Sequence, residues 1–197
     1  MERIVFASSN RGKAKEIQSN LGNSTKLIMQ ADFGVESIEE TGKSFLDNAL
    51  LKAKNAARQT GFPSLADDSG LMVKALEGAP GVYSARYAGP NASDKDNVDK
   101  LLQELEDVPI EKRDAKFICV LVFVRDENDS DPIIARGDWN GRIAFEPFGE
   151  GGFGYDPVFI DDQLNLASAQ LSAEEKNLYS HRGKALLDLK KSLAKLI

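Results

Sequence analysis

The chain has 197 residues, of which 42% are apolar and 28% are charged, and its net charge at pH 7 is −6. These proportions are typical of a globular protein, and the length suits either one domain or two lobes that share a core. The acidic balance argues against a large surface for nucleic acid or for an anionic membrane, because both would repel it. A small anionic ligand is still compatible, since a few lysine and arginine side chains can gather around it.

The single cysteine, Cys119, lies in an apolar run, which predicts a buried thiol and excludes a disulfide framework within the chain. A catalytic thiol is not expected, because no neighbour would lower its pKa. The first residues lack the apolar segment of a signal peptide, and no apolar run approaches the length of a membrane span. We therefore expect a cytoplasmic protein without a membrane partner.

The first part of the chain predicts a strand followed by a helix. Residues 3–8 form an apolar run, and Ala14, Ile17 and Leu21 then recur at helical spacing. A polar loop that enters a helix N-terminus offers backbone N–H groups and the positive end of the helix dipole to an anion. An ordinary capped turn would give the same pattern. The candidate phosphate-binding residues are Ser8, Ser9, Asn10, Arg11, Gly12 and Lys13.

A second strand is expected over residues 26–30, and an acidic loop that contains Glu39 and Glu40 follows it. The sequence Gly42-Lys43-Ser44 resembles the end of a phosphate-binding P-loop. That motif requires a glycine five residues before Gly42, where this chain has Ser37, and no strand precedes it. We therefore reject a P-loop.

Ser44 is expected to cap a helix that runs to about Thr60. Lys52 interrupts the apolar stripe of this helix, in which it follows Phe45 and Ala49. A lysine in such a stripe either extends outward to solvent or points into a ligand site. The sequence leaves both interpretations open.

Two adjacent carboxylates, Asp67 and Asp68, follow a short apolar run and precede Ser69. Because Asp is depleted in strands, we expect a strand to end here and to present both acids at its carboxyl edge, where ligands bind in open α/β sheets. Neighbouring strand residues point to opposite faces, so only one of the two acids reaches a given ligand easily. A turn that needs Asp, Ser and Gly is the alternative. Residues 71–73 are expected to form a separate strand.

The middle of the chain predicts a loop, a helix and a strand. Residues 78–89 are rich in glycine and aromatic residues and carry Arg86. Ser93 and Asp96 are typical of a helix N-terminus. Residues 115–124 form the strongest strand pattern in the sequence, and they are apolar enough for a central position.

A hairpin is expected after this strand. Residues 133–136 and 142–145 could pair around a turn that contains Asn140 and Gly141, because Asn-Gly is a hairpin signal. We expect Trp139 to be a packed aromatic residue of that turn rather than a platform for a ligand.

Residues 149–154 match the dinucleotide-binding pattern G-x-G-x-x-G. The match is rejected, because no strand precedes it and Pro157 forbids a helix immediately after it. We expect these glycines to bring the backbone close to something flat beside Phe153 and Tyr155. Further on, Ser172 opens a short helix, and a last helix is expected over residues 181–196.

Six short motifs follow one another along the chain. They are Ser8-x-Asn10-x-x-Lys13, Glu39-Glu40-Thr41-Gly42, Ala66-Asp67-Asp68-Ser69-Gly70, the stretch 78–87 with Arg86, Gly152-Phe153-Gly154-Tyr155-Asp156-Pro157 and Ser180-His181-Arg182-Gly183. Each is weak alone, but in this order they are highly specific, and they closely resemble the inosine/xanthosine triphosphate pyrophosphatase family in its bacterial form. The resemblance runs from Ile4 to the last helix. One departure is Ser9, where many members have glycine.

The resemblance implies a mixed α/β fold with a long central sheet flanked by helices, two lobes, a deep nucleotide-binding cleft and a homodimer. It implies hydrolysis of ITP, dITP or XTP to the monophosphate and pyrophosphate, with Mg²⁺ as cofactor. Asp68 would be the general base, and Glu39 or Glu40 would help it to place the metal. Phe153 would stack on the purine. The residues implied to bind the substrate are Ser8, Ser9, Asn10, Arg11, Gly12, Lys13, Lys52, Ser69, Phe153, Gly154, Tyr155, Asp156, Lys176, His181 and Arg182.

The sequence is compatible with two other interpretations. A Maf-like nucleotide pyrophosphatase has a similar fold and reaction but different base preferences, and the segment from Phe153 to Asp156 argues against it. A non-catalytic nucleotide-binding protein belongs to a different class. It is disfavoured because such a protein has no need for a base such as Asp68 beside the phosphates.

Overall fold

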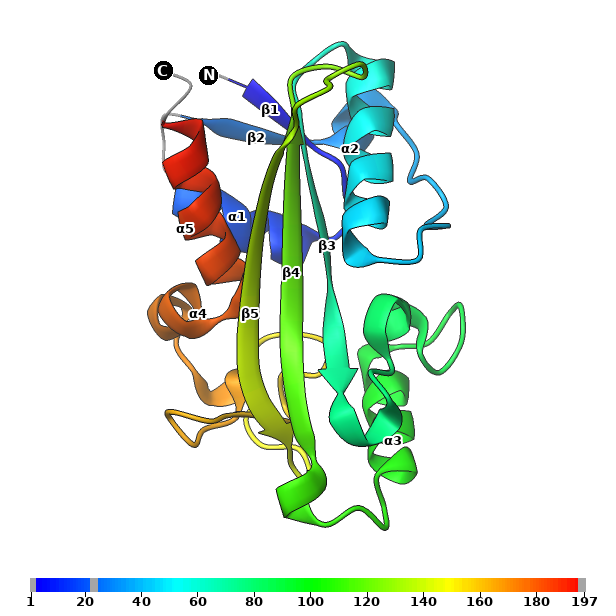
Figure 1. Ribbon diagram of the computed structural model, residues 1–197, viewed down its shortest axis with the longest axis vertical. Helices are drawn as coiled ribbons and strands as arrows, with labels where there is room; N and C mark the ends of the chain where they lie inside the picture. Colours follow the sequence, from blue (N-terminus) through cyan, green and yellow to red (C-terminus); the bar gives the residue numbers. More distant parts are fainter. Residues whose placement is uncertain (1–2, 22–24, 195–197) are drawn as a thin grey trace. The chain divides into compact units, whose positions relative to one another are not determined.

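Six strands form one mixed sheet in the order β2-β1-β3-β4-β5-β6 (Figure 1). The computed structural model describes residues 3–21 and 25–194. Strand β1 pairs in parallel with both β2 and β3, whereas β5 and β6 are antiparallel. The strands are β1 Arg3–Phe6, β2 Lys26–Met29, β3 Ser64–Val73, β4 Asp114–Val124, β5 Ile133–Ile143 and β6 Phe159–Asp161.

Three of the helices begin at serine N-caps. The Ser44 side chain accepts the Asp47 N–H at the start of α2, as predicted, and α3 and α4 each begin with a complete capping box. The last helix was expected to reach residue 196, but residues 195–197 lie outside the described part. The helices are α1 Arg11–Leu21, α2 Phe45–Thr60, α3 Asp94–Glu104, α4 Ala173–Tyr179 and α5 His181–Leu193.

The chain divides into two compact units. Unit 1 comprises Met1–Asp68, Cys119–Gly137 and Arg182–Ile197, and unit 2 comprises Ser69–Ile118 and Asp138–His181. Strands β3, β4 and β5 each contribute residues to both units. Among the described residues, no helix has the combination of length and apolar character that crossing a membrane requires.

The core of unit 1 lies between its strands and helices α1 and α5. Phe6, Leu65, Leu121 and Phe123 pack there with Ile17 of α1 and with apolar residues of α5. Figure 1 shows α2 on the other side of these strands, where its alanines are buried. Cys119 is part of the core, as predicted, and burial raises the pKa of its thiol well above the usual value.

The core of unit 2 is aromatic. Phe117, Trp139 and Phe159 contact one another, with ring centroids 4.7 to 6.1 Å apart. The Trp139 indole N–H donates to Asp161 at 2.5 Å, so the polar edge of this buried side chain has a partner. Apolar residues of α3, among them Leu101, complete the core.

The expectation that a strand ends at Asp67 and Asp68 is wrong. Strand β3 continues through both residues and includes residues 71–73, which were expected to form a separate strand. The interruption was inferred from the low strand propensity of Asp. Here each carboxylate has a cationic partner in the fold, so the backbone continues as a strand despite that propensity.

The predicted hairpin around Asn140 and Gly141 is also wrong. Residues 133–143 form one strand, β5, and neither Asn140 nor Gly141 has the positive φ that an Asn-Gly hairpin turn requires. A Cβ atom at Gly141 would lie 2.6 Å from the Phe159 ring, so this glycine permits close packing of β6 against β5. Trp139 is therefore a packed strand residue, not a turn residue.

Candidate active site

The loop that precedes α1 has the side-chain hydrogen bonds expected at a helix N-terminus. Asn10 Oδ1 accepts the Lys13 N–H at 3.0 Å, and Ser8 Oγ accepts the Asn10 N–H at 3.1 Å. Ser9 and Asn10 of the loop and the first helical residues, Arg11 and Gly12, are exposed, whereas Lys13 is half-buried in the first turn of the helix. The arrangement fits a site for an anion, because the first N–H groups of α1 lie beside a lysine.

The neighbouring acids Asp67 and Asp68 have different partners, as their alternation along β3 predicts. Asp68 Oδ1 accepts a hydrogen bond from Lys52 Nζ at 2.7 Å, and the Asn48 amide donates to Oδ2 at 3.4 Å. Lys52 also donates to Glu40 at 2.8 Å. The ammonium group of Lys52 therefore lies between two carboxylates, instead of extending to solvent.

The charges in this group shift one another's pKa values. Burial raises the pKa of the Asp68 carboxyl, and the opposing effect of Lys52 does not cancel this shift. Burial alone would lower the pKa of Lys52, but Asp68 and Glu40 outweigh it and raise that pKa. Asp68 is thus a carboxylate that takes up a proton more readily than an ordinary Asp, beside a lysine that keeps its own.

Asp67 lies in a second charged group. Its carboxylate binds Lys13, and Arg182 Nε donates to Oδ2 at 3.0 Å. Arg182 Nη1 also donates to Glu16 at 2.5 Å. Burial would raise the pKa of Asp67, but Arg182 and Lys13 outweigh it and hold that pKa well below its ordinary value.

A third group of predicted site residues lies in unit 2, around Asp156. Its carboxylate accepts the Phe153 N–H at 2.9 Å, the Ser168 hydroxyl at 2.7 Å and Lys176 Nζ at 2.5 Å. A Cβ atom at Gly152 would collide with the Asp156 carboxylate. The absence of a side chain at Gly152 therefore permits this close approach of the Asp156 carboxylate.

The remaining predicted residues of unit 2 have separate surroundings. Tyr155 is buried, and its hydroxyl donates to the Ser84 carbonyl at 2.8 Å. Its ring therefore packs in the core, and its hydroxyl has a hydrogen-bond partner within the protein. The Gly154 N–H donates to Asp94 at 2.7 Å. His181 stacks on Phe117, with ring centroids 4.7 Å apart and planes 11° from parallel. Ser69 is half-buried on β3.

Asn48 contacts the predicted base Asp68, and the sequence analysis did not name it. It is fully buried, and besides its contact with Asp68 it accepts the Gly42 N–H at 2.7 Å. Asn48 lies four residues before Lys52 on α2. Residues at this spacing share a helix face, so the sequence could have indicated that Asn48 lies near the same site. A Cβ atom at Gly42 would lie 2.5 Å from Asn48 Oδ1, which explains the glycine of the rejected P-loop motif.

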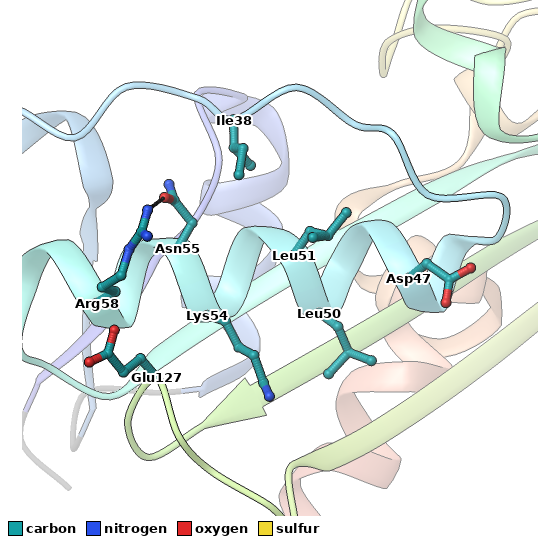
Figure 2. Close-up of a pocket in the computed structure, with 8 residues that line it drawn as sticks. All are labelled: Ile38, Asp47, Leu50, Leu51, Lys54, Asn55, Arg58 and Glu127. Carbon is teal, nitrogen blue, oxygen red and sulfur yellow. Dashed lines mark hydrogen bonds between the residues drawn. The ribbon is translucent and has the colours of Figure 1, made fainter.

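The groups around Asp68, Asp67 and Asp156 differ in whether they could hold a metal ion. Within the described residues, no group of three or more His, Cys, Asp or Glu side chains is arranged to hold a metal ion by itself. Glu40 shares Lys52 with Asp68, whereas Glu39 is exposed. A pocket of about 530 Å³ in unit 1 is lined by six residues of α2 together with Ile38 and Glu127, and it includes none of the predicted site residues (Figure 2).

Comparison with known proteins identifies the family. The family model described as "Ham1 family" matches residues 4–192. The chain belongs to the Ham1 family. A dITP/XTP pyrophosphatase from Pectobacterium atrosepticum is 51% identical over 187 residues, which cover 94% of this chain and 95% of that one. A dITP/XTP pyrophosphatase from Vibrio parahaemolyticus is 50% identical over 190 residues, covering 96% and 95% of the two chains.

Solved structures of similar proteins agree with the fold. A HAM1 protein from Coxiella burnetii superposes with a TM-score of 0.91 at 48% identity, covering 99% of this chain and 100% of that one. A nucleoside-triphosphatase / dITP/XTP pyrophosphatase from Mycobacterium abscessus gives a TM-score of 0.77 at 41% identity, covering 95% and 98%. The predicted mixed sheet flanked by helices is therefore confirmed.

Proposed function

We propose that this Ham1 family protein hydrolyses the deaminated purine nucleoside triphosphates ITP, dITP and XTP to the monophosphate and pyrophosphate. The observation that carries the proposal is the group formed by Asp68, Lys52 and Glu40 in unit 1. It combines a buried carboxylate of raised pKa with a lysine that stays charged. The relatives named dITP/XTP pyrophosphatase match nearly the whole chain, which supports the same reaction here.

In the proposed mechanism, Asp68 accepts the proton of the attacking water. A general base works best when its pKa approaches the working pH, so the upward shift at Asp68 favours this role. Lys13 and Lys52 offset the negative charge of the phosphates, and the first N–H groups of α1 hold phosphate oxygens. Ser8 and Asn10 order the loop that presents these groups.

The residues of this site fit Mg²⁺. The ion prefers carboxylate oxygens and in triphosphate sites takes only one or two of them, with phosphate oxygens and waters as its other ligands. Asp68 and Glu40 would hold it, and Glu40 is favoured over Glu39 because only Glu40 shares a cation with Asp68. When bound, the metal would neutralise phosphate charge and make the attacking water more acidic.

Recognition of the base is proposed for residues of the second half of the chain. Phe153 would stack on the purine, while Asp156, Lys176, His181 and Arg182 would contact its edge. The Asp156–Lys176 pair supports this proposal, because it fixes a cationic donor beside the Phe153 backbone. Arg182 has two carboxylate partners in unit 1, so a role in base recognition would have to be combined with those ion pairs.

The experiment that tests the function is incubation of the purified protein with Mg²⁺ and a panel of triphosphates, with pyrophosphate and orthophosphate measured separately. We expect pyrophosphate from ITP, dITP and XTP, little from GTP and least from ATP. A preference for other bases would favour a Maf-like enzyme, and tight binding without pyrophosphate release would favour a non-catalytic protein.

We also propose that the protein forms a homodimer, and sedimentation equilibrium tests this oligomeric state.

A further inference from the structure

Asp67 accepts hydrogen bonds from three side chains at once. Lys13 Nζ binds Oδ1, while Arg182 Nε and Cys119 Sγ lie 3.0 and 3.2 Å from Oδ2. The three donors belong to α1, α5 and β4, so a single carboxylate joins three elements of unit 1. The partners of the neighbouring Asp68 are different ones, on α2.

The charged groups around Asp67 form a chain of alternating sign. Lys13 binds Asp67, Asp67 binds Arg182, and Arg182 binds Glu16 one turn further along α1. The Asp67 side chain is fully buried, and a buried ionised carboxylate is tolerated only while its cations stay in place. The position of the Lys13 ammonium group is therefore coupled to that of a carboxylate with little freedom to move.

This contact prepares Lys13 for a ligand. A lysine side chain loses conformational entropy when a phosphate fixes it, and Asp67 has already removed part of that freedom. The Lys13 ammonium group has three donor hydrogens, so one bond to Asp67 does not exhaust them. The cost is electrostatic, because the carboxylate offsets part of the charge that would attract the phosphate.

We propose that Asp67 is a positioning residue, which acts through Lys13 by holding its ammonium group where charge develops on the leaving pyrophosphate. The inference rests on the function proposed above, because it takes Lys13 as a phosphate ligand. Asp67 touches neither the water nor the substrate in this proposal, and the role of general base stays with Asp68.

The test is a double-mutant cycle with Asp67→Asn and Lys13→Met, measured with ITP and Mg²⁺. Asp67→Asn alone is expected to lower kcat by about 10- to 100-fold, because a misplaced catalytic contact has an effect of this size. KM should change by less than about 3-fold, since loss of the carboxylate frees the charge of Lys13 for ground-state binding. In the Lys13→Met background, Asp67→Asn should change kcat by less than about 2-fold, because its effect passes through Lys13.

Asp129→Asn is the matched control for loss of a buried, ion-paired carboxylate. Asp129 is also buried in unit 1, and it accepts the Arg125 Nε–H at 2.8 Å. None of the hydrogen bonds or ion pairs described for Asp129 reaches a proposed site residue. Its replacement should leave kcat and KM unchanged. Circular dichroism and thermal unfolding of every variant separate lost structure from lost turnover.

Two results would overturn the proposal. One is an equal fall of kcat on Asp67→Asn with and without Lys13, which would mean that Asp67 acts independently of it. The other is an unchanged kcat in the single variant. If Asp67→Asn does not fold, Asp67→Glu takes its place, because it keeps the charge and moves the carboxylate by one methylene, and the same cycle decides. An inactive wild-type protein would instead refute the proposed function.

Discussion

At the scale of single residues, Asp68 carries the clearest prediction. Replacement by Asn keeps the shape and an oxygen that can accept the Lys52 hydrogen bond, but the amide cannot take a proton from water. We expect Asp68→Asn to lower pyrophosphate release from ITP by about 10²- to 10⁴-fold, the usual contribution of a general base. Calorimetry with a non-hydrolysable ITP analogue should still detect binding. A variant with near-normal turnover would refute Asp68 as the base.

The contact between Lys52 and Asp68 predicts how activity depends on pH. The active form of Asp68 is the carboxylate, so kcat/KM should fall as the pH drops through its pKa, which burial raises above the ordinary 3.8. The charge of Lys52 lowers the Asp68 pKa in opposition to burial. Lys52→Met removes this charge, and it should move the acidic limb of the remaining activity to higher pH.

Lys54→Met is the control for this shift, because Lys54 is on the same helix and exposed. Its pH profile should match that of the wild type. An acidic limb that stays in place in Lys52→Met would show that the limb reports a group other than Asp68.

At the scale of elements, two substitutions in β5 test whether Asn140 and Gly141 belong to a strand or to a hairpin turn. In a strand, Asn140 is exposed and replaceable, while Gly141 faces the Phe159 ring. Gly141→Ala should lower the free energy of unfolding by about 1–3 kcal/mol through overpacking. Asn140→Ala should change it by less than about 0.5 kcal/mol, as at an ordinary surface position. Urea unfolding measures both. A large loss in Asn140→Ala would favour the hairpin turn inferred from the sequence.

The elements that the sequence predicted well are those with local signals. The caps of α2, α3 and α4 depend on residues within one turn of each helix, so Ser44, Ser93 and Ser172 could be identified directly. The two strand errors depend on distant partners. Nothing near Asp68 in the sequence reveals that Lys52 would compensate its charge, and nothing near Gly141 reveals the Phe159 ring.

The same reason limits what could be predicted of the site. The predictions of an anion-binding loop before α1 and of Asp68 as the general base rest on local pattern and on the family resemblance. The ion pairs of Asp67 with Lys13 and Arg182 span 54 and 115 residues of sequence, and no local pattern encodes them. Arg182 therefore emerged as a partner of Asp67 only from the fold.

At the scale of the whole molecule, the proposed phosphate residues lie in unit 1, and the Asp156–Lys176 pair lies in unit 2. ITP and ATP carry the same triphosphate and differ in the base, at a 6-oxo against a 6-amino group. Variants of the proposed phosphate residues, such as Lys13 and Lys52, should therefore lower kcat/KM for both substrates by the same factor. Variants of the pair in unit 2 should change the ratio between them.

Lys176→Met tests this division directly. The Lys176 ammonium group is a donor only, so it suits the 6-oxo group of ITP and leaves the amino group of ATP facing another donor. We expect kcat/KM to fall by about 10-fold or more for ITP, with a much smaller change for ATP, so that the ratio narrows. Lys95→Met is the control, because Lys95 pairs with Asp99 on the exposed surface of α3 in the same unit, and it should leave both values unchanged. Equal proportional losses on ITP and ATP in Lys176→Met would mean that this lysine supports the fold or the phosphates, and base selection would then have to be sought at other residues.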